Sequence, residues 1–459
     1  MEARFEVRKE ELLDECKLPP QTFRDMTPRL ERFMEPFTES LTREEQYAHA
    51  RTYVCGLLSD LDHKNVESIA YRFGQGRMGL QRFVGFSNWD ESPLIDELIR
   101  QVSKELAESD AVIVFDPSAF PKSGKESVGV TRQWCGRLGK IDNCQVGVFM
   151  GYVSRKEHAL VDTRIYLPKE WTKDRKRCRK AGVPSRVRYR TRHQLCLEML
   201  KKHGPRLPHA WITGDDEMGR SYAFRRDLQE LEEQYLLAVP SNTLIRDLEV
   251  PLPEYCGTGR KPNRPWQRVD RWDASMPAEK WTRIDVRDGA KGPLIVEATA
   301  QRVFARASQR REGHEEILVI FRYRDRDNRQ IVKTDYYLSN ASIETPLSEF
   351  ARAAKAEHRI EECLQRSKSE AGLADYEVRS WTGWQHHQTL SLIATWFLLK
   401  ETRRGKKMDA CDHAATNPRR HLGPTSPRVR MRHTVAHPTR TRTAISSKRT
   451  GAPLPLETT

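Results

Sequence analysis

The spacing of hydrophobic residues changes several times along this chain, and each change predicts a different type of element. In about the first hundred residues, apolar positions recur every three or four residues, as at Tyr53 and Leu57, which is typical of amphipathic helices. Helix starts are expected near Glu44, where acidic residues suit an N-terminus, and near Ser92, which is followed by a proline. The pattern therefore predicts a helical N-terminal domain over residues 1–107.

Short apolar runs replace the helical spacing between residues 108 and 245. Strands are predicted in AVIVFD, CQVGVFMGYVS and ALVDTRIYLP, followed by a helix over residues 185–202. A short strand then ends in the acids of HAWITGDDEMGR, SYAFRRDLQELEEQ has the pattern of a helix, and QYLLAVPSN supplies a last strand. This order of strands and helices predicts an α/β fold with a ribonuclease H-like mixed sheet.

The rest of the chain divides into three further stretches. Residues 246–345 begin with several prolines and continue in runs that alternate polar and apolar residues, which predicts a β-rich insertion. Residues 346–407 return to helical spacing and are expected to complete the α/β core. Residues 408–459 carry eight arginines and one lysine against three acids and have little apolar periodicity, which predicts a disordered basic tail. A translated frameshift would also produce this abrupt change.

The composition favours a polyanionic partner. The chain of 459 residues has a formal net charge of +15 and an isoelectric point near 9.4, which favours nucleic acid as that partner. No apolar run approaches the roughly 20 residues that span a bilayer, and the N-terminus lacks the apolar core of a secretory signal. We expect a cytoplasmic protein without membrane contact, whose N-terminal helices bind DNA or serve as structural support.

Three acidic positions suggest a metal site. Asp116 follows the first apolar run and Asp215 or Asp216 follows the fourth, so strands that lie side by side would bring two carboxylates together. Glu361 lies in the returning helix, and Lys368 follows it two helical turns later on the same face, where it could hold a phosphate. Taken alone, these residues also fit a strand that enters a turn and a helix with a solvated charged face.

Several long segments resemble the insertion-sequence 701 family of bacterial transposases, which is related to the insertion-sequence 4 superfamily. They are FDPSAFPKSGKESVGVTRQWCGRLGKIDNCQVGV, WITGDDEMGRSYAFR, LLAVPSN and RIEECLQRSKSEAGLADYEVRSWTGWQHHQTLSLIATWFL. The resemblance implies an Asp-Asp-Glu transposase with a ribonuclease H-like fold, which cuts DNA at the ends of an insertion sequence and joins the 3′-hydroxyls to target DNA. It also implies a homodimer that acts on paired double-stranded DNA ends.

The same resemblance assigns catalysis and metal binding to Asp116, Asp215 and Glu361. The implied cofactor is Mg²⁺, as two ions that activate the attacking oxygen and stabilise the leaving one, with Mn²⁺ as a substitute. Asp216 stays as an alternative to Asp215, and Glu362 as an alternative to Glu361 that points roughly 100° away around the helix.

The helix motif departs from the superfamily pattern Y-x-x-R-x-x-x-E-x-x-x-x-x-x-K. Its last two elements match Glu361 and Lys368, but the tyrosine and arginine positions hold Ala354 and Glu357. An acid in place of the arginine removes a phosphate contact and adds repulsion beside the metals. Two alternatives to an active transposase therefore stay open: an inactive remnant that only binds DNA, and a metal-dependent nuclease without strand transfer.

Candidate DNA contacts lie in the insertion and after the first strand. Relatives stack a flipped base on an aromatic ring, for which Trp266, Trp272 and Trp281 are candidates, with packing as the competing role. Basic residues after the first strand suit phosphate contacts: Lys122, Lys125, Arg132, Arg137 and Lys140. A second basic run, RKRCRK over residues 175–180, is either a DNA contact or a solvated face.

Overall fold

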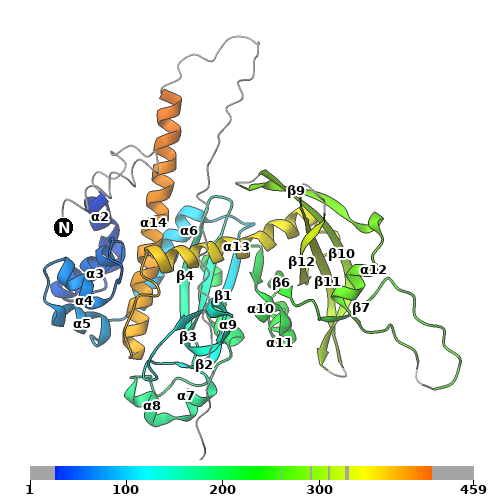
Figure 1. The fold of residues 1–459 in the computed structure, drawn as a ribbon, viewed down its shortest axis with the longest axis horizontal. Coiled ribbons are helices and arrows are strands. Elements are labelled where there is room, and N and C mark those ends of the chain that lie inside the picture. Colours follow the sequence, from blue (N-terminus) through cyan, green and yellow to red (C-terminus); the bar gives the residue numbers. More distant parts are fainter. Residues whose placement is uncertain (1–25, 260, 290–291, 309–310, 326–329, 416–459) are drawn as a thin grey trace, which may run out of the picture. The chain divides into compact units, whose positions relative to one another are not determined.

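The computed structural model describes residues 26–259, 261–289, 292–308, 311–325 and 330–415 (Figure 1). Its N-terminal part is helical, as the apolar spacing predicts, with α2 (Met26–Thr38), α3 (Glu44–Leu57), α4 (Val66–Arg72), α5 (Arg77–Gly85) and α6 (Ser92–Leu106). No helix within these ranges is long and apolar enough to cross a membrane. Most of the predicted basic tail, residues 416–459, lies outside the described residues.

The strands of the described residues form one mixed sheet. Their order is β2-β3-β1-β5-β6-β12-β11-β10-β7-β8, with β4 paired to β3 and β9 paired to β10. The first half comprises β1 (Val112–Pro121), β2 (Thr131–Cys135), β3 (Lys140–Val153), β4 (His158–Ile165), β5 (Trp211–Gly214) and β6 (Tyr235–Val239). The second half comprises β7 (Leu244–Asp247), β8 (Gln267–Arg268), β9 (Thr282–Gly289), β10 (Gly292–Ser308), β11 (Arg311–Arg324) and β12 (Ile331–Ser339).

Strand β1 is central to the predicted ribonuclease H-like part of the sheet. It pairs antiparallel with β3 on one side and parallel with β5 on the other, and β5 pairs parallel with β6. Residues 111–115 are all buried, because a strand covered on both faces carries a continuous apolar run instead of an alternating one. The order β4-β3-β1-β5-β6 and its mixed pairing confirm the predicted fold class.

The β-rich insertion extends this sheet. Strand β12 pairs antiparallel with β6, and β11 pairs antiparallel with both β12 and β10. The insertion adds helix α12 (Val269–Ser275), and a second apolar core forms around residues such as Ile245, Trp272 and Leu318. A buried ion pair joins it to the first half of the chain, because Nε of Arg225 lies 2.7 Å from Oε1 of Glu316.

Helix α13 (Leu347–Glu370) returns from the insertion across the sheet and contacts β1, β3, β4, β5 and β6 (Figure 1). Its buried face includes Phe350, Ile360 and Leu364. Gly151 of β3 permits the close approach, since a Cβ at this position would lie 2.4 Å from Cδ1 of Ile360. Helix α14 (Trp381–Ala415) follows and packs against the N-terminal helices, with Nε1 of Trp396 donating to Oε1 of Gln101 at 3.1 Å.

The remaining helices and turns lie in the connections between the strands. They are α7 (Lys169–Lys173), α8 (Arg175–Lys180), α9 (Arg192–His203), α10 (Asp216–Arg220) and α11 (Tyr222–Glu230), with the 3₁₀ turns η2 (Gly136–Leu138), η3 (Gly204–Arg206) and η4 (Ala278–Lys280). The helix predicted over residues 185–202 begins only at Arg192, because Thr191 and Gln194 form a capping box there. Likewise, the basic segment after β1 is not only a loop, since part of it pairs as β2 against β3.

Candidate active site

Asp116 and Asp215 lie at the point where two parallel strands stop pairing. The last register pair of β1 and β5 is Phe115 with Gly214, so Asp116 and Asp215 are the residues that directly follow this pair in the sequence. The sequence pattern predicted that Asp116 ends its strand. This prediction is wrong, because β1 continues to Pro121 while paired only with β3. Both carboxylates therefore lie where the pairing of β1 with β5 ends, close enough for the charge of Asp215 to raise the pKa of Asp116.

The structure separates Asp215 from its neighbour Asp216. Asp215 is the N-cap of α10, where its Oδ1 accepts a hydrogen bond from the backbone N–H of Met218 at 3.1 Å. The side chain of Asp216 is 54% exposed, and Oδ2 lies 3.0 Å from Arg220 on the same helix. Asp215 is thus the acid of this pair that lies beside Asp116, whereas Asp216 belongs to a surface ion pair.

The electrostatic environment of Asp116 is strongly unfavourable to a carboxylate. Burial, together with the negative charges of Asp215 and Glu361, raises the pKa of Asp116 to about 7, and the charge of Lys368 opposes the rise. Lys368 reaches this end of β1 from α13, where its Nζ donates to Oγ of Ser118 at 2.6 Å. The site therefore concentrates acids around a single nearby lysine, an arrangement that a cation would relieve.

Helix α13 directs Glu357 toward the aspartates. Burial and the charges of Asp215, Glu361 and Asp116 raise the pKa of Glu357 to about 8. By contrast, the side chain of Glu361 is 59% exposed, and its Oε2 lies 3.5 Å from Nδ1 of His358. Glu357 and Glu361 are one helical turn apart, so both belong to the edge of the site, with Glu357 the more enclosed of the two.

The carboxylate oxygens of these acids are the type of ligand that a hard divalent cation prefers. Burial and the charges of Glu217 and Asp216 raise the pKa of Asp215 to about 6, against the effect of its backbone hydrogen bond to Met218. In the described part of the chain, no three His, Cys, Asp or Glu side chains are placed to hold one metal ion together. Mg²⁺ commonly takes only one or two carboxylates and fills its other positions with waters and substrate phosphates. A pair such as Asp116 and Asp215 meets that requirement.

Comparison with known proteins agrees with this geometry. The family model described as DDE superfamily endonuclease matches residues 36–293, more than half of the chain. This chain belongs to that family. The matched range contains Asp116 and Asp215 and ends before α13.

One relative of this chain is described as the probable transposase for insertion sequence element IS701, from Microchaete diplosiphon. The two are 26% identical over 242 residues, which is 52% of this chain. The match spans 59% of the relative's length. The resemblance found in the sequence motifs is thereby confirmed at the level of the family.

The predicted phosphate-binding residues divide into two groups. Lys122 is turned inward, where its Nζ donates to the backbone oxygen of Tyr376 at 2.9 Å and lies 3.4 Å from the ring centroid, and burial lowers its pKa to about 8. The side chains of the other four lie on the exposed surface: Lys125, Arg132, Arg137 and Lys140. Lys122 therefore supports the fold around the site, whereas the other four are exposed, with Lys140 paired to Asp142.

The three tryptophans of the insertion also differ in position. Trp272 is 3% exposed and belongs to the insertion's core, with its Nε1 donating to Asp247 at 2.9 Å. Trp266 is partly exposed beneath the guanidinium of Arg246, and Trp281 beneath that of Arg322. A base could reach Trp272 only if that core opened, so its position corresponds to the packing role.

Sequence inspection missed one exposed aromatic residue near the site. Trp134 of β2 is 58% exposed and lies opposite the exposed Ile141 of β3. On the same strand, Gln133 accepts a hydrogen bond from Arg192, which is also paired with Glu217 of α10. The alternation of exposed and less exposed positions in TRQWC could have indicated an exposed tryptophan, but a tryptophan in a strand is ordinarily expected to be largely buried.

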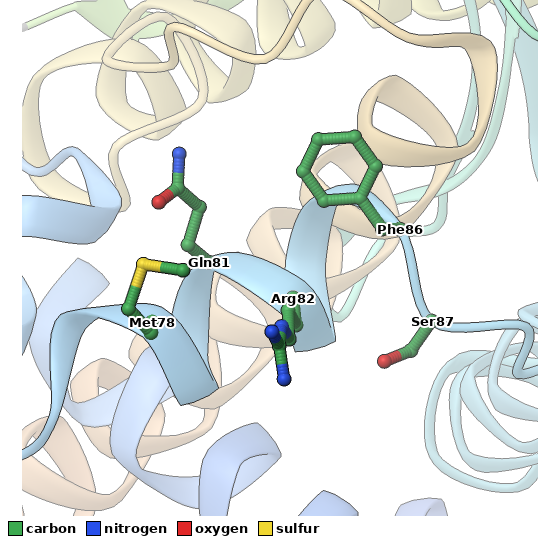
Figure 2. Close-up of a pocket in the computed structure, with 5 residues that line it drawn as sticks. All are labelled: Met78, Gln81, Arg82, Phe86 and Ser87. Atoms are coloured by element: carbon green, nitrogen blue, oxygen red, sulfur yellow. The ribbon is translucent and has the colours of Figure 1, made fainter.

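A separate hollow of about 500 Å³ lies over α5 and is lined by Met78, Gln81, Arg82, Phe86 and Ser87 (Figure 2). It belongs to the N-terminal helices and contains none of the carboxylates described above.

His386 and His387 of α14 are buried and hydrogen-bonded, His386 to backbone oxygens and His387 to Tyr53, as expected for satisfied polar residues.

Proposed function

We propose that this chain is a DNA transposase that cuts double-stranded DNA at the ends of an insertion sequence and joins the 3′-hydroxyls to target DNA. The observation that carries the proposal is the juxtaposition of Asp116 and Asp215 at the divergence of β1 and β5. Membership of the DDE endonuclease family and the similarity to a probable transposase support it. The proposal includes a homodimer on paired ends, as the resemblance implies.

The residues of the site have separable roles in this proposal. Asp116 and Asp215 would hold divalent metal, with Glu361 joining them from α13 when substrate is present. Two bound Mg²⁺ ions, or Mn²⁺ in their place, would activate the attacking oxygen and stabilise the leaving oxygen. Lys368, held beside Asp116 by Ser118, would position a backbone phosphate over the carboxylates. Trp266 and Trp281 are the aromatic rings of the insertion that could receive an unstacked base.

A second candidate function is DNA binding without cleavage. Glu357 supports it, because this acid stands where the superfamily pattern has an arginine and lies among the site's other carboxylates. Glu361 also supports it, since its exposed side chain contacts His358. Both observations are compatible with an active enzyme if bound metal neutralises Glu357 and draws Glu361 inward.

Cleavage of plasmid-borne element ends distinguishes the two functions. With Mg²⁺, the wild-type chain is expected to release the element, and Asp116→Asn to lose this activity by on the order of 10⁴-fold. Asp216→Asn is the matched control, because Asp216 has the same charge and is exposed in a surface pair with Arg220. DNA binding without excision by the wild-type chain would support the binding-only function. Undiminished cleavage by Asp116→Asn, with folding intact, would refute the proposed site.

A further inference from the structure

The densest positive charge in this chain lies between Lys169 and Arg192, a segment that we call the basic strip. It contains eleven arginines and lysines against Glu170 and Asp174, so its net charge is 11 − 2 = +9. The whole chain, by the same count, has 79 − 64 = +15. More than half of the net charge is therefore concentrated in 24 residues that comprise α7, α8 and the connection to α9.

Most of these cations are not neutralised by the protein. Two pair with surface acids, Lys180 with Glu126 and Arg190 with Glu198. Two others are held within the fold: Arg177 over the ring of Trp171, and Arg192 against Glu217. The other seven are exposed and form no ion pair with an acid in the described part of the chain: Lys169, Lys173, Arg175, Lys176, Arg179, Arg186 and Arg188.

The basic strip is anchored to the core, which distinguishes it from a solvated charge run. Trp171 is fully buried, and its Nε1 donates to the backbone oxygen of Val130 at 2.8 Å. Asp174 caps α8 by accepting from the N–H of Arg177, and Cys178 is buried below the same helix. The backbone oxygen of Ala181 accepts from the N–H of Trp381 at 2.8 Å. The charges therefore have a fixed platform.

The C-terminal end of the strip is joined to the candidate active site. Nη1 of Arg192 lies 2.5 Å from Oε2 of Glu217, and Nε2 of His193 lies 3.1 Å from the backbone oxygen of the same residue. Glu217 belongs to α10, the helix that Asp215 caps. The segment that carries the exposed cations is thus fixed at its C-terminal end to the helix that begins at Asp215.

From this arrangement we propose that the basic strip binds the phosphate backbone of the DNA duplex whose cleavage site lies at Asp116 and Asp215. The inference rests on the proposed function, since the continuity with Asp215 selects DNA among polyanions. An anionic membrane fits less well, because the apolar residues of α7 and α8, Trp171 and Cys178, are buried and leave no apolar face to enter lipid. Phosphate contacts of this kind confer affinity and orientation without reading sequence.

The test compares variants of equal charge. Arg175→Gln/Lys176→Gln/Arg179→Gln removes three cations of the strip, and Lys104→Gln/Lys201→Gln/Lys202→Gln removes three exposed cations of α6 and α9. Binding of the full chain to a random duplex of about 40 base pairs is measured without metal between about 50 and 200 mM KCl. The strip variant should reduce the slope of log K against log salt by about 2 to 3, with a loss on the order of 100-fold near 0.1 M. The control should retain nearly the wild-type slope.

Equal slopes for the two variants would overturn the inference, because the effect would then come from net charge alone. Binding to phosphatidylserine vesicles is measured in parallel. A strip variant that no longer binds vesicles, but whose DNA binding has the wild-type dependence on salt, would also overturn the inference. Cleavage separates this result from the proposed function. If the wild-type chain cuts DNA and the strip variant binds DNA normally, only the proposed role of the basic strip is refuted. If the wild-type chain neither binds nor cuts DNA, both that role and the proposed function are refuted.

Discussion

At the scale of single residues, Glu357 has the most informative environment. Burial and the charges of four acids, Asp215, Glu361, Asp116 and Asp335, raise its pKa to about 8. An unfolded glutamate titrates near 4.3, so between about pH 4 and 8 the folded chain keeps a proton that the unfolded chain has released. Because the folded state binds more protons in this window, the free energy of unfolding falls as pH rises.

Glu357→Gln is therefore expected to stabilise the protein in the absence of divalent metal. At pH 8 the gain in unfolding free energy should be on the order of 2–4 kcal/mol, and it should shrink steadily as the pH falls toward 4. Chemical denaturation at several pH values, with EDTA present, measures this difference. Glu362→Gln is the control, since that side chain is exposed and contacts His358 instead of the aspartates. A gain that does not change with pH would contradict the electrostatic explanation.

At the scale of elements, the approach of α13 to β3 determines where the helix carries its acids and Lys368. Gly151 makes this approach possible, because its missing Cβ leaves room for Ile360. The same helix contributes Glu357, Glu361 and Lys368 to the site. Any change that lifts α13 from the sheet should therefore affect stability and cleavage together.

Gly151→Ala is expected to cost about 1–3 kcal/mol of stability, because the new methyl group would overlap Ile360. Ile360→Val in the Gly151→Ala background should recover part of that loss by removing a methyl at the contact. Urea unfolding of the two single variants and the double variant gives the interaction energy. Additive effects would show that the two residues do not share the contact. Plasmid cleavage should decline in the single Gly151 variant and recover partly in the double variant.

At the scale of the whole molecule, one apolar core connects the N-terminal helices, the first half of the sheet and helices α13 and α14. It includes Phe37 and Tyr53 as well as Val114 and Trp396. Arg29 of α2 also pairs with Glu401 of α14 at 2.6 Å. The N-terminal helices, which were predicted as a domain of their own, are thus continuous in packing with the rest of the chain.

This continuity predicts that the helices and the sheet unfold together. Trp396→Ala should cost about 3–5 kcal/mol, because the fully buried ring leaves a cavity between α14 and α6. Hydrogen exchange followed by mass spectrometry should then accelerate in peptides of both α3 and β1. Exchange that increases in α3 alone would indicate that the helices open as an independent unit.

The hypothesis that a frameshift produced residues 408–459 stays a prediction. If it is correct, the neighbouring reading frame after Lys407 encodes sequence with helical periodicity. A stop codon or unrelated sequence in that frame would refute it.

Patterns along the chain were enough to predict the kind of fold and the strand ends at which candidate acids lie. Continuous apolar runs such as 111–115 specify buried strands because burial on both faces removes the need for alternation. The order of these runs then predicted the mixed sheet. The positions next to two of the strands singled out Asp116 and either Asp215 or Asp216, and the family resemblance favoured Asp215. These properties are local, so local patterns are sufficient to find them.

The surroundings of the polar side chains, by contrast, depend on the tertiary structure. It placed Asp215 beside Asp116 and Asp216 in a surface pair, enclosed Glu357 more than Glu361, and turned Lys122 inward. Burial and neighbouring charge together determine what an ionisable group can do. For Asp116, Glu357 and Lys122 the decisive neighbours come from other elements of the chain, so a local sequence pattern contains the residue types but not those neighbours.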